Sequence, residues 1–150
     1  MTKILLSLHV LAAIVAIGPV TVAASMFPPA ARRTTPADGV ATAALLHRIC
    51  RVCAGVGLAV PALGFATAAA MGVLGSGWLI TSIAVTAAAA GILVAFVLPR
   101  QEELLDRLED ERAPDHRDTV QLAMFTGVFN LLWATVTVLM IVRPGSTTGA

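Results

Sequence analysis

Apolar residues in this chain gather into four long runs separated by short polar stretches. The runs predict helices over residues 4–27, 45–73, 78–98 and 119–142. Each is near or above the roughly 20 apolar residues that cross about 30 Å of hydrocarbon as an α-helix. The polar stretches are too short to fold as separate domains. The pattern therefore predicts one all-α domain, residues 1–150, that crosses a bilayer four times as a helix bundle.

Three connections of different character join these runs. The first, over residues 28–44, begins with two prolines and carries Asp38-Gly39, which is typical of a loop. The second, Gly75-Ser76-Gly77, is short and uncharged, so it predicts a tight hairpin. In the third, leucines recur at helical spacing among acidic residues, and Pro99 suits a first helical position. This predicts an amphipathic surface helix over residues 99–112 at the cytoplasmic face.

Composition supports a membrane protein and argues against other classes. The chain is 57% hydrophobic and 13% charged, and its net charge is +1. Because it has no large basic block, we expect no nucleic-acid binding. Lys3 ahead of an apolar run resembles a secretory signal. We interpret the run as a retained helix instead, because it is about twice as long as a signal core and Arg32 and Arg33 follow it.

Basic residues are distributed unevenly between the two sides of the predicted bundle. Only Lys3 and Arg143 lie on the side of the termini. The remaining basic residues lie in or beside the first and third connections: Arg32, Arg33, Arg48, Arg51, Arg100, Arg107, Arg112 and Arg117. Lysine and arginine near helix ends are retained in the cytoplasm. We therefore expect a multi-pass protein of the bacterial inner membrane with both termini external.

Small residues predict which helix faces pack together, because helices in lipid associate where their backbones approach closely. The expected internal faces include Ala12 and Ala16 in the first helix and Ala87, Gly91 and Ala95 in the third. In the last helix the side with Gly127, Asn130 and Ala134 is expected to face the bundle, and Phe129 to face lipid.

Asn130 lies near the middle of the last apolar run. An amide without partners there would cost several kcal/mol. We interpret Asn130 as a structural polar residue that hydrogen-bonds another helix, with a buried ligand as the alternative partner.

His47, Cys50 and Cys53 place three candidate metal ligands on adjacent turns of one helix face. A closed zinc site requires a fourth ligand. Cysteine is also an ordinary small apolar residue in such helices. Packing is therefore the interpretation that we favour, and a metal or redox site is its alternative.

His9 is a polar residue on the alanine-lined face of the first helix, near the outer boundary. Met71 ends the second helix at a similar depth, so the two side chains are candidate ligands of haem b or copper. The alternative that we favour is a hydrogen bond from His9 to a carbonyl or hydroxyl, with no cofactor. His9 and His47 cannot share one iron, because the antiparallel topology separates them by roughly the bilayer thickness.

Several short motifs carry a family resemblance. They are Leu8-His9-Val10-Leu11 through Gly18, Gly77-Trp78, Pro99-Arg100 and the closing segment 139–144. With these the chain resembles an uncharacterised bacterial family of predicted integral membrane proteins, domain of unknown function twenty-two sixty-nine. The resemblance covers nearly the whole chain and implies the same fold but no function.

The first helix is also distantly similar to those of the copper-resistance D proteins and the membrane protoporphyrinogen oxidases. In these families a first-helix histidine is linked to metal or haem, which the likeness carries to His9 alone. This sequence departs from them at Gly18-Pro19 and lacks an outer-face histidine partner.

Hydrolase, kinase and paired-carboxylate motifs do not occur in the sequence, so we expect a protein that is not an enzyme. We interpret it as an accessory or scaffold component that acts with a membrane-protein partner or as a homo-oligomer. Haem or copper binding through His9 is the alternative. A transporter is disfavoured because four helices without buried charge offer no coupling site.

Overall fold

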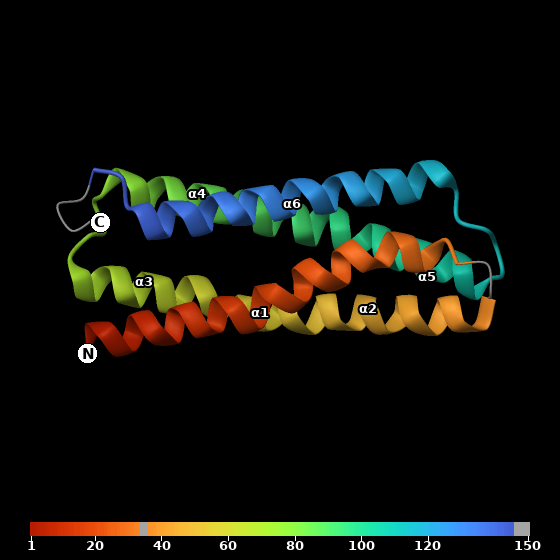
Figure 1. Ribbon diagram of the computed structural model, residues 1–150, viewed down its shortest axis with the longest axis horizontal. Coiled ribbons are helices and arrows are strands. Elements are labelled where there is room, and N and C mark those ends of the chain that lie inside the picture. The colour runs from red at the N-terminus through yellow and green to blue at the C-terminus, as the bar shows by residue number, and fades with distance from the viewer. Residues whose placement is uncertain (34–35, 146–150) are drawn as a thin grey trace.

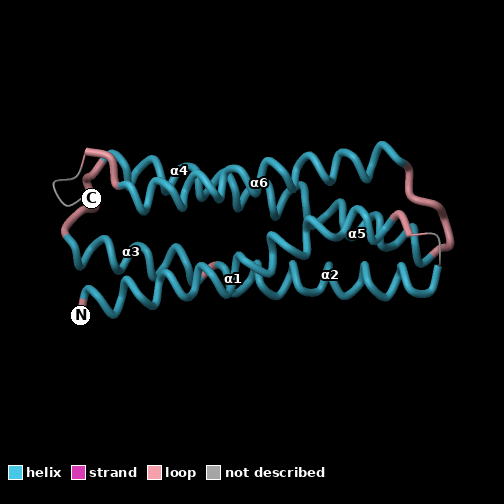
Figure 2. The backbone as a smooth tube through the Cα atoms, in the orientation of Figure 1, coloured by secondary structure: helices cyan, strands magenta, loops and turns pink. Residues whose placement is uncertain are grey.

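The computed structural model describes residues 1–33 and 36–145, and these residues fold into helices joined by short connections. The described residues form four long apolar rods. The rods lie lengthwise beside one another (Figure 1), and short loops join them (Figure 2). The elements are α1 (Thr2–Ala31), α2 (Pro36–Gly57), α3 (Ala59–Met71), α4 (Gly77–Ile92), the π-helical turn η1 (Leu93–Val97), α5 (Leu98–Glu109) and α6 (His116–Val142). These two ranges contain no strand, which confirms the predicted all-α class.

Each rod is long and apolar enough to span a membrane. In the described part of the chain these spans are Thr2–Ala31, Asp38–Met71, Gly77–Glu109 and His116–Val142. The N-terminus, the α3–α4 hairpin and the end of α6 lie at one end of the bundle (Figure 1). The opposite end holds the loops that follow α1 and α5. We call it the arginine-rich end, because it carries Arg32, Arg33, Arg107, Arg112 and Arg117.

The second rod is interrupted at Leu58, between α2 and α3. Pro61 explains the interruption, because it has no amide hydrogen and its ring crowds the carbonyl of Gly57, four residues earlier. The Leu58 amide instead donates to the Gly55 carbonyl over 3.2 Å. The helix predicted over residues 45–73 is thus present as two segments, and it begins earlier, at Pro36.

The third rod is continuous from α4 into α5. Pro99 cannot donate to the carbonyl of Ala95, and η1 absorbs this defect as a wider turn in which the Leu98 amide donates to the Leu93 carbonyl. The helix expected over residues 99–112 therefore prolongs the third span and ends at Glu109. It packs against α2 and α6 and does not lie apart from the bundle.

The prediction of a loop over residues 28–44 is wrong, because most of these residues are helical. α1 continues through Pro28 and Pro29 to Ala31, and α2 begins at Pro36, so residues 32–35 alone connect them. Neighbouring helices can hold a proline-containing segment helical by packing around it. Pro28 is buried in this way, and its carbonyl accepts from the Arg32 amide over 3.3 Å.

The main core lies in the half of the bundle nearer the arginine-rich end and draws on every rod, and a smaller cluster of Ala68, Trp78 and Leu79 lies near the α3–α4 hairpin. The buried apolar residues of the main core include Val20, Ala24 and Phe27 of α1, Ala43, Leu46 and Cys50 of α2, Leu93 and Val97 of η1, and Leu122 and Phe129 of α6. Ala16 and Val20 are 1% and 0% exposed, as the alanine-lined face of the first helix predicted.

The face expected for the third span is wrong, and so is the lipid-facing assignment of Phe129 in the last span. Ala87, Gly91 and Ala95 are exposed, and Phe129 is 1% exposed. Asn130, by contrast, contacts another helix as expected, through its bond to Ser25 of α1. Where helices do not approach closely, bulky side chains are needed to fill the interior to normal density. Phe129 stacks on Trp133 with a centroid distance of 6.5 Å, and Phe125 stacks on Phe96 at 4.8 Å. Small residues mark only the closest approaches of helices, so they did not identify these faces.

Large apolar side chains cover the outside of the rods. Leu11, Leu131 and Ile141 are 58%, 70% and 72% exposed. An apolar exterior of this extent is unfavourable in water and matches hydrocarbon. The fold is therefore that of a helical bundle with lipid around it.

Candidate functional site

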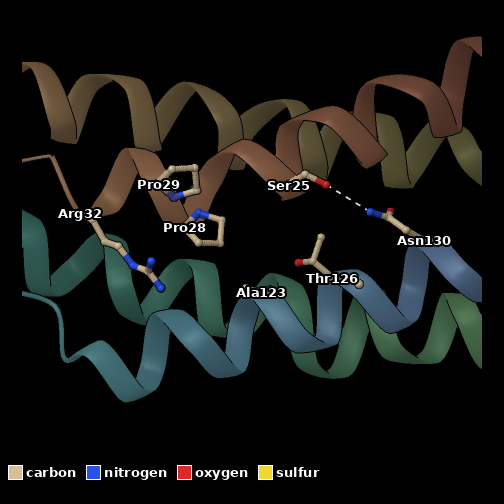
Figure 3. Close-up of a pocket in the computed structure, with 8 residues that line it drawn as sticks. Ser25, Pro28, Pro29, Arg32, Ala123, Thr126 and Asn130 are labelled. Atoms are coloured by element: carbon tan, nitrogen blue, oxygen red, sulfur yellow. Dashed lines mark hydrogen bonds between the residues drawn. The ribbon is translucent and has the colours of Figure 1, made fainter.

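A cavity of about 240 Å³ lies between α1 and α6, towards the arginine-rich end (Figure 3). We call it the α1–α6 groove. It is lined by Ser25, Pro28, Pro29 and Arg32 on one side and by Ala123, Thr126, Gly127 and Asn130 on the other. Gly127 faces open space in the groove, because a Cβ added there would meet no atom within 4 Å.

Asn130 lies at the end of the groove that is farthest from Arg32 (Figure 3). Its Nδ2 donates to the Ser25 hydroxyl oxygen over 3.1 Å, which joins α6 to α1 (Figure 3). The amide oxygen of Asn130 is buried and has no hydrogen-bond partner within the described residues. Asn130 thus contacts another helix and still has free hydrogen-bonding capacity.

Thr126 adds a second polar group to the groove. The residue is 3% exposed, and its hydroxyl has no partner within residues 1–33 and 36–145. Other helical hydroxyls bond to the carbonyl four residues earlier in their own helix, among them those of Thr67, Thr81, Thr86, Thr135 and Thr137. Thr126 departs from that pattern and lines the groove instead.

Arg32 stands at the outer end of the groove. Its Nε donates to the Thr119 hydroxyl oxygen over 3.1 Å, and that hydroxyl donates to the His116 carbonyl over 2.9 Å. The bond to Thr119 directs the guanidinium into the space between α1 and α6 (Figure 3). None of the ion pairs among the described residues includes Arg32. The groove therefore carries a cation at one end and neutral polar groups at the other.

His9 packs against α3. Its Nδ1 lies 3.0 Å from the Val60 carbonyl oxygen, and its ring covers Gly64, where an added Cβ would come within 2.8 Å of Cε1. Met71 lies seven residues beyond Gly64 along the same helix, about 10 Å further on. His9 thus contacts a backbone carbonyl, as the hydrogen-bond interpretation expects. Met71 lies further along α3 than the part that the His9 ring contacts.

His47 and Cys50 contact Gln101, a side chain that the sequence did not single out. His47 Nδ1 lies 3.2 Å from Gln101 Oε1, and Gln101 Nε2 lies 3.6 Å from Cys50 Sγ. All three residues are buried, whereas Cys53 is only half-buried. No group of three His, Cys, Asp or Glu side chains in the described ranges is placed to hold a metal ion. This network joins α2 to α5.

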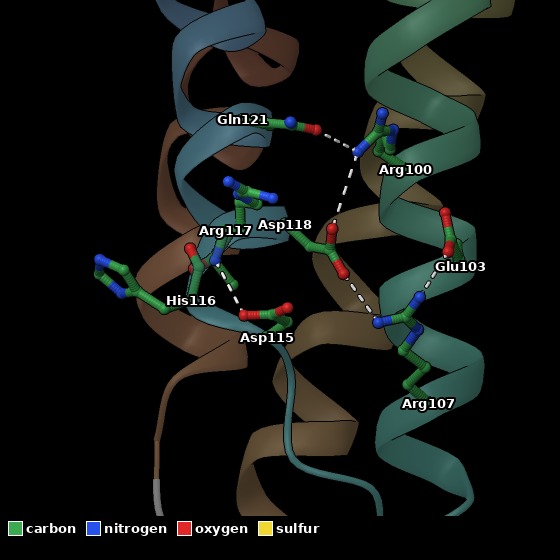
Figure 4. Close-up of polar contacts among 9 residues, drawn as sticks. Arg100, Glu103, Arg107, Asp115, His116, Arg117, Asp118 and Gln121 are labelled. Carbon is green, nitrogen blue, oxygen red and sulfur yellow. Dashed lines mark hydrogen bonds and ion pairs between the residues drawn. The ribbon is translucent and has the colours of Figure 1, made fainter.

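Ion pairs tie α5 to the start of α6 (Figure 4). The Asp118 carboxylate lies 2.7 Å from Arg107 Nη1 and 3.9 Å from Arg100 Nη1. Arg107 also pairs with Glu103 at 2.7 Å, and Arg100 donates to Gln121 Oε1 over 2.6 Å. The Asp115 side chain caps α6 by accepting from the Arg117 amide over 3.2 Å. Opposite charges thus compensate one another where α5 meets α6.

Sequence reasoning found Asn130 but missed the residues around it. Ser25 and Thr126 are two of several hydroxyl residues within the apolar runs, so the sequence does not single them out. Arg32 was counted only for its charge. Its contact with Thr119 spans 87 residues of sequence and depends on the register between α1 and α6.

The apolar exterior, four long spans and polar contacts between rods define a multi-span α-helical membrane protein. A family model described as a predicted integral membrane protein, DUF2269, matches residues 3–144. The chain belongs to this family, which confirms the resemblance carried by its short motifs. The family's biochemical role is unknown. No curated protein and no solved structure gives a significant match to the chain.

Proposed function

We propose that this protein is a non-catalytic accessory or scaffold component of the bacterial inner membrane. One observation carries the proposal: the polar side chains inside the bundle join helices. His9 bonds to α3, His47 to α5 and Asn130 to α1. Polar side chains that hydrogen-bond to a neighbouring helix stabilise the association of helices in lipid.

The proposed orientation places the arginine-rich end, including α5, in the cytoplasm and both termini outside. Its support is the positive-inside rule, applied to the loops that follow α1 and α5. The 34-residue second rod would extend about 50 Å, which exceeds the roughly 30 Å of hydrocarbon. The cytoplasmic end of the bundle would therefore project beyond the bilayer.

The proposed contact surface is the acidic face of α5. Glu102, Asp106 and Glu109 are exposed, while Gln101 and Leu104 on the other side are buried. None of these three carboxylates belongs to an ion pair among the described residues. Such a face complements a basic segment of a membrane-protein partner. A second copy of the chain is the alternative partner.

Photocrosslinking in cells tests this surface. A benzoylphenylalanine at position 106 should form a discrete protein adduct, and the combined Glu102→Gln and Glu109→Gln changes should weaken it. The same probe at position 131, on the lipid-facing side of α6, is the matched control and should give no protein adduct. An adduct of twice the chain's mass would indicate a homo-oligomer, and equal labelling at both positions would contradict the proposed surface.

Genetic complementation tests the non-catalytic role. Gln replaces His47 conservatively as a hydrogen-bonding partner of α5, so a His47→Gln chain should still rescue a deletion phenotype. The α5 variant should fail to rescue it while remaining stably inserted. If one conservative change of a titratable residue abolished rescue in a stable chain, a catalytic role would be indicated instead.

A further inference from the structure

We propose that the α1–α6 groove binds an anionic phospholipid from the surrounding leaflet, with the lipid phosphate on Arg32. The groove offers three features in order along its length. Arg32 supplies the cation, Thr126 a buried hydroxyl and Asn130 a buried amide oxygen. Pro28, Pro29, Ala123 and Gly127 form apolar or small walls between them.

The cation is suited to a phosphate. A guanidinium has five N–H donors, and the bond to Thr119 uses only Nε, so the two terminal nitrogens of this groove-lining side chain have no partner among the described residues. Arg107, by contrast, is compensated by Asp118 and Glu103. Arg32 therefore combines free donors with a fixed position, which is what bidentate phosphate binding requires.

The unpartnered hydroxyl of Thr126 indicates a ligand that extends along the groove beyond a phosphate bound at Arg32. A buried hydroxyl without a partner destabilises the fold, and a carbonyl oxygen in the groove would remove that cost. Thr126 and Ser25 line the same groove, and Ser25 is seven residues before Arg32, or about 10 Å along α1. Phospholipids carry ester carbonyls on the bilayer side of their phosphate, in this same order.

The amide of Asn130 can serve the same ligand. A half-turn of the amide lets the Ser25 hydroxyl donate to Oδ1 and leaves the NH₂ group to donate into the groove. A free phosphate ion would occupy Arg32 and leave the Thr126 hydroxyl and the Asn130 amide oxygen without partners. The deep polar groups therefore favour a lipid over a soluble anion.

Native mass spectrometry of the full chain in neutral detergent, titrated with phosphatidylglycerol, tests the proposal. Arg32→Gln and Thr126→Val should each weaken lipid retention about fivefold, the equivalent of about 1 kcal/mol for one charge or one hydrogen bond. Gly127→Leu fills the open groove and should remove the bound lipid. Matched controls are Arg33→Gln beside the groove, Thr135→Val with its self-bonded hydroxyl, and Gly91→Leu on an open face; each should leave retention unchanged.

Two results would overturn the proposal. Equal loss in Arg32→Gln and Arg33→Gln would show that diffuse surface charge attracts the lipid. Displacement of the lipid by inorganic phosphate or glycerol phosphate would show a site for a soluble anion. Thermal unfolding of each variant shows whether it is folded, and if Gly127→Leu is not, Arg32→Gln and Thr126→Val decide the outcome.

Discussion

The Asn130 side chain donates to the hydroxyl oxygen of Ser25 over 3.1 Å, across 105 residues of sequence. This bond joins the first and last spans, which no loop connects. We predict that Asn130→Leu lowers the free energy of unfolding by about 0.5–2 kcal/mol, because an interhelical bond in lipid is lost. Thermal unfolding in detergent measures this. In a double-mutant cycle with Ser25→Ala the two changes should be less than additive; full additivity would mean that the pair does not interact.

Substitution of Phe129 should destabilise the bundle strongly, although the sequence pattern predicts that this side chain faces lipid. It is 1% exposed and stacks on Trp133, whereas the nearby Leu131 is 70% exposed. Phe129→Ala should cost about 3–5 kcal/mol through the cavity that it leaves, and Leu131→Ala should cost much less. Unfolding measurements on both variants provide the comparison, and equal losses would restore the lipid-facing assignment of Phe129.

Gly64 is needed because the His9 ring lies over it. In Gly64→Ala the new Cβ would stand 2.8 Å from Cε1, so the ring must shift away from the Val60 carbonyl. We predict a loss of about 1–3 kcal/mol from this overpacking. Gly91→Ala is the control, because its Cβ would enter open space. The Gly64→Ala loss should shrink in a His9→Ala background; if it does not, the two residues are not in contact.

Asp118 joins two arginines of α5 and should show the salt dependence of an ion pair. Its side chain is 25% exposed and that of Arg107 is 36% exposed, so solvent screens the pair. We predict that Asp118→Asn lowers stability by up to about 1 kcal/mol at low ionic strength, and by less at high salt. Asp110→Asn, in a pair 60% and 72% exposed, should have a smaller effect. A loss at Asp118 that salt leaves unchanged would indicate a packing role.

Much of the fold could be predicted from the chain, because it depends on local properties. The number and approximate length of the spans depend on runs of apolar residues, and the inward face of α1 follows from Ala16 and Val20 at helical spacing. Prolines were less informative. The same residue type interrupts the helix near Pro61, is absorbed by η1 before Pro99 and lies within α1 at Pro28. What differs is the packing around each, which the local sequence does not encode.

The contacts that form the candidate sites depend on register between distant helices. Gln101 meets His47 across 54 residues and Arg32 meets Thr119 across 87, and no local pattern sets these alignments. Asn130 was identifiable because an amide in an apolar run must have a partner. Its partner was not, because Ser25 is one of several hydroxyl residues within the apolar runs.

The orientation of the four spans is the most direct test of the proposed account. In a chain with Cys50→Ala and Cys53→Ala, single cysteines at Ser76→Cys and Ala113→Cys report the hairpin and the loop before α6. A membrane-impermeant maleimide applied to intact cells should label position 76 and not position 113, which should react only after permeabilisation. Labelling of position 113 but not 76 in intact cells would contradict the proposed orientation, and labelling of both before permeabilisation would contradict the proposed topology.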